Sequence, residues 1–460
     1  MIQESDKMSA IAAISTPNAP GGIAVIRISG DTALEIADRV FQSVSGKKAV
    51  TMSGYTCSYG TAFDGDERLD DCILTVFKAP NSYTGENVAE LSCHGGLYVT
   101  KRILRAILKN GAESASAGEF TKRAFLNGKL DLTQAEAVMD IISAKGNIEL
   151  KMAESLRDGA AFRKSQSAKK KLIKILGDLA AWADYPDEDI PEVEPESLMT
   201  SLKDIRNELG SLIKGYDYGK ILREGIDTVI IGRPNVGKST LFNCLSGCER
   251  SIVTEIAGTT RDVIEESVKI GDLTLRLSDT AGIRDTDDVI EGIGVNIAYK
   301  RLDEAQLIIA VFDGSCPLTE DDINLLKKLK DKKAIAVINK NDVEQKIDSD
   351  IIKSNNIQIV YISAKENKGI QEVQQAIESL FEANELDFES GTAANERQKR
   401  CIDLCLQQID EAISALESGV LLDAITVLLD EAVQHILELT GEKATVAVVD
   451  EVFSRFCVGK

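Results

Sequence analysis

A glycine-rich octapeptide, Gly232-Arg-Pro-Asn-Val-Gly-Lys-Ser239, constrains the fold of this 460-residue chain more than any other segment. It follows the apolar run 226–231 and continues into Thr240-Leu-Phe-Asn-Cys-Leu-Ser, so the local order is strand, glycine loop, helix. In that order, backbone N–H groups and the positive end of a helix converge on one anionic group without Cβ atoms in the way. Lys238 is placed to reach β- and γ-phosphates, and Ser239 to ligate Mg²⁺. The segment predicts a nucleoside triphosphate site.

Three further motifs follow predicted strands: Asp279-Thr-Ala-Gly282, Asn339-Lys-Asn-Asp342 and Ser363-Ala-Lys365. Ligands of open α/β sheets bind at the carboxyl ends of the strands, so these loops should converge on the phosphate loop. Asp342 can accept hydrogen bonds from the ring N–H and the exocyclic amino group of guanine, a donor pair that adenine lacks on that edge. The predicted nucleotide is therefore GTP.

The segment Gly258-Thr-Thr-Arg-Asp262 follows the first predicted helix of this region and offers Thr260 as a second hydroxyl ligand for Mg²⁺. Ras-like enzymes orient the attacking water with a glutamine directly after the D-x-x-G motif, but here that residue is Ile283. The next loop carries several charged residues, and spacing alone does not choose among them: Arg284, Asp285, Asp287, Asp288 and Glu291.

Apolar spacing divides the rest of the chain. Residues 1–130 alternate short apolar runs with turn signals, whereas helical periodicity dominates residues 131–220 and returns in residues 384–460. Each helical set has an apolar stripe that needs a partner, so the two sets are expected to form one domain. The predicted fold class is multidomain: an α+β N-terminal domain, a discontinuous all-α helical domain and an inserted Ras-like α/β P-loop GTPase domain at 221–383.

Composition limits the function further. The formal net charge of −21 argues against a wide nucleic-acid-binding face. Two basic clusters, Lys101 to Arg105 and Arg163 to Lys174, are either local patches or solvated helix faces. Nine cysteines without a C-x-x-C pair argue against a zinc site or a disulfide framework. Neither a long apolar stretch nor a signal-peptide pattern is present, so a cytoplasmic protein without a membrane segment is expected.

These motifs together resemble the MnmE (TrmE) family of tRNA uridine-modification GTPases over essentially the whole chain. The resemblance also rests on four segments outside the nucleotide motifs: Pro80-Asn-Ser-Tyr-Thr-Gly-Glu-Asn-Val-Ala-Glu-Leu91, Cys93-His-Gly-Gly96, Gly118–Leu132 and the ending Phe456-Cys-Val-Gly-Lys460. It implies a K⁺-stimulated GTPase that works with an MnmG-like FAD protein in a heterotetramer or larger complex. The pair would install an aminomethyl or carboxymethylaminomethyl group on carbon 5 of the wobble uridine of certain tRNAs.

The resemblance further implies that the N-terminal domain dimerises and binds a tetrahydrofolate, in the 5-formyl or methylene form, as the one-carbon source. The circular homodimer would bring two GTPase domains together when GTP and K⁺ are bound. It also implies a set of site residues, each at a position that matches a family motif. The folate contacts are Arg27, Glu90, Lys129 and Lys460; the K⁺ ligands are Asn235, Thr254, Ile256 and Thr259; the catalytic carboxylate is Glu291.

The predicted GTP contacts come from the phosphate loop, the two switch loops and the two guanine-recognition loops. They are Asn235, Val236, Gly237, Lys238, Ser239, Thr240, Thr254, Glu255, Ile256, Ala257, Gly258, Thr259, Thr260, Asp279, Thr280, Ala281, Gly282, Asn339, Lys340, Asp342, Ser363, Ala364 and Lys365. The predicted Mg²⁺ ligands are Ser239 and Thr260. Cys457 lies three residues from a terminal lysine, and is either a reactive thiolate for one-carbon chemistry or a small buried cysteine.

Two other functions fit parts of the sequence. A GTP-dependent assembly factor for ribosomal RNA would carry nearly the same GTPase motifs, but would usually add a basic RNA-binding module. A scaffold whose first domain binds no folate is the other alternative. His94, which precedes two glycines, is interpreted as a turn residue rather than a general base.

Overall fold

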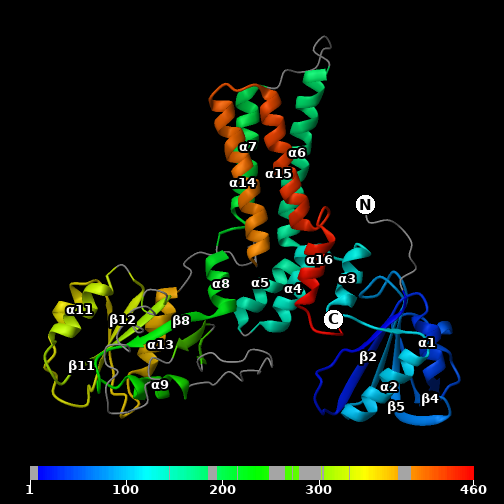
Figure 1. The fold of residues 1–460 in the computed structure, drawn as a ribbon, viewed down its shortest axis with the longest axis horizontal. Helices are drawn as coiled ribbons and strands as arrows, with labels where there is room; N and C mark the ends of the chain where they lie inside the picture. Colours follow the sequence, from blue (N-terminus) through cyan, green and yellow to red (C-terminus); the bar gives the residue numbers. More distant parts are fainter. Residues whose placement is uncertain are drawn as a thin grey trace. The chain divides into compact units, whose positions relative to one another are not determined.

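The computed structural model describes residues 9–144, 146–184, 194–214, 216–247, 265–271, 273–278, 302, 305–330, 332–381 and 395–459. The chain divides into two compact units (Figure 1). The first comprises Met1–Ile142, Glu154–Leu212 and Glu396–Lys460, and the second Ser143–Ala153 and Ile213–Asn395. The first unit thus contains helices from both sides of the nucleotide-binding segment, and the predicted multidomain fold class is confirmed.

The first unit contains a seven-stranded sheet in the order β3-β4-β5-β6-β2-β1-β7, antiparallel except for β1 and β7. Its strands are β1 (Ile11–Ile14), β2 (Ile23–Ser29), β3 (Phe41–Ser43), β4 (Thr56–Asp64), β5 (Glu67–Phe77), β6 (Val88–His94) and β7 (Glu113–Ser114). One face packs against α1 (Ala33–Val40) and α2 (Leu97–Lys109) through residues such as Ile26, Leu74 and Leu91. Side chains alternate along a strand, so Arg27 and Glu90 lie on the other face.

Short helices and the chain end pack on this second face. The helix α3 (Glu119–Leu126) places Phe120 in a cluster with Ile11 and Ala13 of β1. The last helix, α16 (Val446–Ser454), packs against α3. Beyond it, Val458 pairs with Ala117 in a β-bridge, and Ser15 Oγ donates a hydrogen bond to the Gly459 carbonyl at 3.0 Å. The C-terminal residues are thereby attached to the N-terminal sheet.

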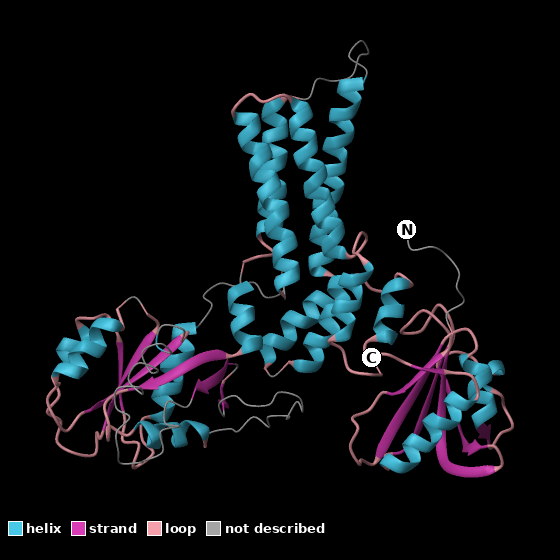
Figure 2. Ribbon diagram, viewed as in Figure 1, coloured by secondary structure: helices cyan, strands magenta, loops and turns pink. Residues whose placement is uncertain are grey.

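Four long helices form a bundle in the first unit: α6 (Ala160–Asp184), α7 (Pro195–Gly210), α14 (Glu396–Glu417) and α15 (Leu422–Thr440). Their apolar stripes, spaced three and four residues apart, meet in the interior. Two further helices, α4 (Leu132–Ser143) and α5 (Asn147–Arg157), precede the bundle. In Figure 2 the bundle is drawn as helices, coloured cyan. Among the described residues, no helix combines the length and low charge needed to cross a membrane.

The second unit contains a six-stranded sheet in the order β13-β12-β11-β8-β10-β9, which is parallel except for the edge strand β9. Its elements are β8 (Ile226–Ile231), β9 (Glu265–Ile270), β10 (Leu273–Ser278), β11 (Leu307–Asp313), β12 (Ala334–Asn339), β13 (Gln358–Tyr361), α8 (Tyr216–Glu224), α9 (Lys238–Ser246), α11 (Glu320–Lys328), α12 (Ser349–Lys353) and α13 (Ile370–Phe381). The central strands β11 and β12 read as continuous apolar runs because helices cover both faces.

Candidate functional site

The phosphate loop joins β8 to α9, as the sequence predicts. Gly232 has φ +156° and Gly237 has φ +99°, which places Gly237 in the left-handed region. A Cβ at Gly232 would overlap the Val311 carbonyl oxygen, and one at Gly237 would overlap the Asn339 amide nitrogen. Glycine is therefore required at both ends of the loop, because the Val311 backbone lies too close to Gly232 for a side chain and the Asn339 side chain lies too close to Gly237.

Lys238 begins α9 and folds back over the loop. Its Nζ donates hydrogen bonds to the carbonyl oxygens of Gly232 at 2.9 Å and Arg233 at 2.8 Å. Burial lowers the pKa of this ammonium from its usual value. Ser239 is exposed at the start of the helix, where its hydroxyl is accessible to a metal ion. A cradle of backbone N–H groups, an ammonium and a hydroxyl fits a nucleotide phosphate with Mg²⁺.

Asn339 connects the phosphate loop to the predicted guanine-recognition loop. Its side chain is 4% exposed, donates from Nδ2 to the Val236 carbonyl at 2.8 Å and accepts at Oδ1 from the Ala364 backbone N–H at 3.0 Å. Both ends of this amide are used, so its orientation is fixed. The predicted convergence of Asn339, Ser363 and Ala364 with the phosphate loop is present in the structure.

Asp342 lies beside that loop and is exposed. Ser363 Oγ donates to Asp342 Oδ1 at 2.7 Å, and this hydrogen bond lowers the pKa of the carboxyl from its usual value. Asp342 is therefore ionised at neutral pH and able to accept two hydrogen bonds from a ligand edge. Lys340, with φ +66°, instead donates to Asp313 at 2.6 Å, and Lys365 is exposed.

Several predicted residues lie outside the described part of the chain. They are the switch segment Thr254–Thr260, the motif Asp279–Gly282, the carboxylate Glu291 and the terminal Lys460. The described residues therefore place Asn235, Val236, Gly237, Lys238, Ser239, Thr240, Asn339, Lys340, Asp342, Ser363, Ala364 and Lys365, but not the predicted switch or K⁺-ligating loop.

A second polar site lies on the N-terminal sheet. Arg27 of β2 and Glu90 of β6 are directly opposite in register, and Arg27 Nε donates to Glu90 Oε1 at 2.8 Å. Lys129 is exposed and donates to the Pro80 carbonyl at 3.1 Å. The site also contains Tyr83 and Phe120, whose rings lie on Arg27. Both belong to segments singled out in the sequence, but nothing in the local spacing indicated that they meet.

Cys457 is exposed, so the interpretation of a small buried cysteine is wrong. Its carbonyl accepts from the Gly118 N–H at 3.4 Å, which holds this part of the tail beside α3.

The two basic clusters singled out in the sequence are partly neutralised by ion pairs. Arg102 pairs with Glu67 at 2.6 Å, and Lys169 pairs with Glu442 at 2.7 Å.

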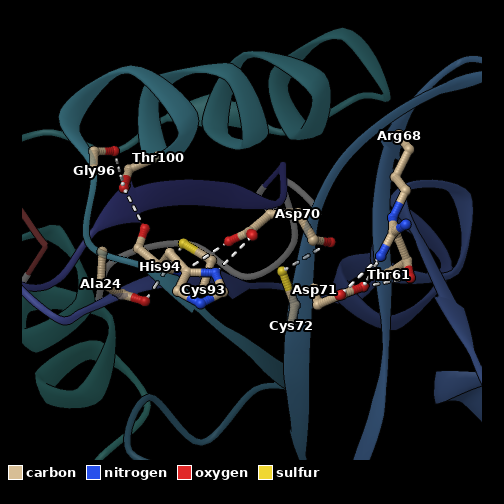
Figure 3. A network of polar contacts seen from close by, with 10 residues as sticks. All are labelled: Ala24, Thr61, Arg68, Asp70, Asp71, Cys72, Cys93, His94, Gly96 and Thr100. Atoms are coloured by element: carbon tan, nitrogen blue, oxygen red, sulfur yellow. Dashed lines mark hydrogen bonds and ion pairs between the residues drawn. The ribbon is translucent and has the colours of Figure 1, made fainter.

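His94 ends β6 and takes part in a network with Asp70 of β5 (Figure 3). Its Nδ1 lies 2.7 Å from Asp70 Oδ1, and its backbone N–H donates to Asp70 Oδ2 at 2.8 Å. The Thr100 hydroxyl donates to the carbonyl oxygens of His94 and Gly96. These contacts fix the turn at this strand end, in agreement with the interpretation of His94 as a turn residue.

A pH effect follows from this pair. Donation from the His94 ring to the Asp70 carboxylate raises the pKa of His94 above its ordinary 6.5, so the pair stabilises the fold fully below that value. The contribution is lost as the pH rises through the raised folded-state pKa. We expect Asp70→Asn to lower the His94 pKa in an NMR titration and to remove this part of the pH dependence of thermal stability. An unchanged His94 pKa would contradict the contact.

Two family models match the chain. The MnmE helical domain matches residues 132–457, and the GTP-binding protein TrmE N-terminus matches residues 10–129. The G domain of the FeoB iron transporter of T. maritima aligns with 34% of this chain and 98% of its own at 27% identity, with a TM-score of 0.26. At a TM-score this low, the alignment does not by itself show a shared fold.

Two relatives are similar to this chain over nearly its whole length. The chain is 42% identical over 453 residues to a protein of Clostridioides difficile named tRNA modification GTPase MnmE, with 98% of this chain and 99% of that one covered. A protein of Acetivibrio thermocellus with the same name is 42% identical over 459 residues, covering 99% of this chain and all of the relative. The phosphate loop, the guanine-recognition loop and this end-to-end similarity agree: the chain belongs to the MnmE family of tRNA modification GTPases.

Proposed function

We propose that this chain hydrolyses GTP to GDP and phosphate as part of tRNA modification. The observation that carries the proposal is the buried Asn339 amide, which joins the phosphate loop to the loop that holds Asp342. This connection makes one continuous site for the phosphates and the base of a guanine nucleotide. The 42% identity to relatives named tRNA modification GTPase supports the biological setting.

The catalytic roles follow from the residue types. The phosphate loop and Lys238 bind and orient the triphosphate, while Asp342 selects guanine. Ser239 and Thr260 would hold Mg²⁺, and Asn235 with Thr254, Ile256 and Thr259 would hold K⁺. Bound at those positions, the two cations supply positive charge to the β- and γ-phosphate oxygens. The residue after the D-x-x-G motif is the apolar Ile283, and the family resemblance implies that Glu291 would orient the attacking water instead.

The tRNA modification itself would require a second protein. An MnmG-like flavoprotein would assemble with a homodimer of this chain in the cytoplasm and supply FAD. The complex would place an aminomethyl or carboxymethylaminomethyl group on the wobble uridine of certain tRNAs. Residues 1–130 would dimerise and bind the tetrahydrofolate, residues 131–220 and 384–460 would form the helical domain, and residues 221–383 the GTPase domain.

The folate proposal is supported by the pair of Arg27 and Glu90. A carboxylate such as Glu90 can accept from the amino-pyrimidinone edge of a pteridine, while Lys129 and Lys460 would supply cations for the glutamate tail. Cys457 is exposed on the tail beside α3, so its thiol is accessible to solvent. It would take part in the one-carbon transfer. Binding of 5-formyltetrahydrofolate, measured by calorimetry, tests this part separately from GTP hydrolysis.

GTP turnover in K⁺ against Na⁺ at matched ionic strength tests the hydrolysis mechanism. Strong stimulation by K⁺ supports the site at Asn235, and its loss in Asn235→Ala would tie the effect to that side chain. Equal rates in both salts would remove the K⁺ site from the mechanism and leave a GTPase that uses another charge.

Replacing Glu291 with alanine is expected to abolish hydrolysis while GTP affinity is retained. The carboxylate would act on the attacking water rather than on the bound nucleotide, so its loss affects the transition state and not the ground state. The measurement pairs single-turnover hydrolysis with competition binding of GTP. Asp288→Ala, three residues earlier, is the matched control, and unchanged turnover in Glu291→Ala would exclude the assigned role.

A further inference from the structure

We infer that Tyr83 determines specificity in the folate site proposed above, where its ring selects ligands that carry a flat heteroaromatic ring. The inference rests on the proposed folate function and adds a residue to it. Tyr83 is 37% exposed, and its hydroxyl lies 2.9 Å from Thr121 Oγ1 of α3. The polar end of the side chain is therefore anchored while part of the ring remains accessible.

The Tyr83 ring lies on the same guanidinium that pairs with Glu90. The Cζ atom of Arg27 is 5.6 Å from the Tyr83 ring centroid and 5.5 Å from that of Phe120. Phe120 is fully buried in its cluster with Ile11 and Ala13, so its ring is not accessible to a ligand. Of the two aromatic rings on this guanidinium, only Tyr83 is able to touch what binds beside the ion pair.

A buried polar network fixes the loop that carries Tyr83. Ser29, two residues beyond Arg27 on β2, contacts Thr84 Oγ1 at 2.7 Å and donates to Glu86 Oε2 at 2.6 Å. Arg123 of α3 is 3% exposed, and its Nη1 donates to Glu86 Oε1 at 3.2 Å. The strand, the loop and the helix are thus connected through Glu86. Tyr83 is held in its position before ligand binds, so little conformational entropy is lost on binding.

The ligand class follows from the two kinds of contact. Arg27 occupies Glu90 Oε1, and the structure gives the other oxygen of this carboxylate no hydrogen bond among the described residues. That oxygen can accept from an N–H donor edge in the plane of a ring, while the Tyr83 ring offers a flat apolar surface beside it. A planar heterocycle with amino and ring N–H donors satisfies both, whereas an aliphatic or purely anionic ligand satisfies neither.

The test separates the ring from its hydroxyl. Calorimetry with 5-formyltetrahydrofolate, 6-methylpterin and p-aminobenzoylglutamate compares the whole ligand with its two halves. In Tyr83→Leu we expect about tenfold weaker binding of 5-formyltetrahydrofolate and 6-methylpterin, as for loss of an aromatic stack. Binding of p-aminobenzoylglutamate, which lacks the pteridine, should change by less than about twofold. Tyr83→Phe and Thr121→Val keep the ring, and should retain most of the affinity for all three.

The outcomes are distinct. Equal weakening of all three ligands in Tyr83→Leu, or no weakening of any, would overturn the inference, because the ring would then be structural or irrelevant. Should Tyr83→Leu lose its native melting transition, Tyr83→Phe decides: pteridine affinity lost with the ring still present also overturns it. A wild-type chain that binds none of the three ligands would instead overturn the proposed folate function itself, and the inference with it.

Discussion

Replacing Asp342 with asparagine is expected to lower GTP affinity by about a thousandfold or more. The carboxylate accepts from both donors on the guanine edge, and a site built around such contacts discriminates by up to about 10⁴ to 10⁵. Asparagine offers one acceptor and one amide donor, so the guanine amino group would face another N–H group. The same change should favour xanthosine triphosphate, whose ring carries a carbonyl where guanine has the amino group.

Competition against a fluorescent guanine nucleotide measures both affinities. Asp350→Asn is the matched control, because Asp350 lies in the same unit and forms only an exposed ion pair with Lys353. Ser363→Ala should cause a smaller loss, since it removes the hydrogen bond that holds Asp342 rather than the acceptor itself. Unchanged GTP affinity in Asp342→Asn would show that this residue does not read the base.

Local patterns predicted the elements that carry the nucleotide site. The octapeptide between an apolar run and a helix was sufficient to place β8, the loop and α9, because glycine spacing and strand position fix the backbone there. Convergence of Asn339 with Ser363 followed from the rule that loops gather at the carboxyl ends of parallel strands.

Long-range contacts were not predictable in this way. Arg123 and Glu86 are separated by 37 residues, and Arg397 and Glu136 by 261, so no periodicity connects them. Tyr83 belongs to the segment 80–91, which carries part of the family resemblance, yet its position on Arg27 depends on the network through Ser29 and Glu86. The family resemblance singled out Arg27 and Glu90 but not the aromatic residue beside them, because that contact exists only after the sheet and α3 have packed.

Arg397→Met is expected to be strongly destabilising, by about 3 kcal/mol or more. Arg397 is the second residue of α14, and its Nε and Nη2 donate to the two carboxylate oxygens of Glu136 on α4, each at 2.8 Å. The side chains are 18% and 9% exposed. Arg397 also donates to the carbonyls of Glu438 and Leu439, near the end of α15. Its removal leaves a buried carboxylate and helix-end carbonyls without these donors, which is the costly case for a buried ion pair.

Differential scanning calorimetry of the full chain measures this effect as a shift in the transition that contains the helical bundle. Arg206→Met is the matched control, since Arg206 and Asp410 pair across α7 and α14 with side chains 49% and 47% exposed. Screening by solvent limits such a pair to about 1 kcal/mol or less. Replacing Arg397 with methionine and Glu136 with leucine together should recover part of the loss, because no charge is then buried alone. Equal shifts for Arg397→Met and Arg206→Met would show that the buried pair contributes no more than an exposed one, and that helix packing alone holds the start of α14 against α4.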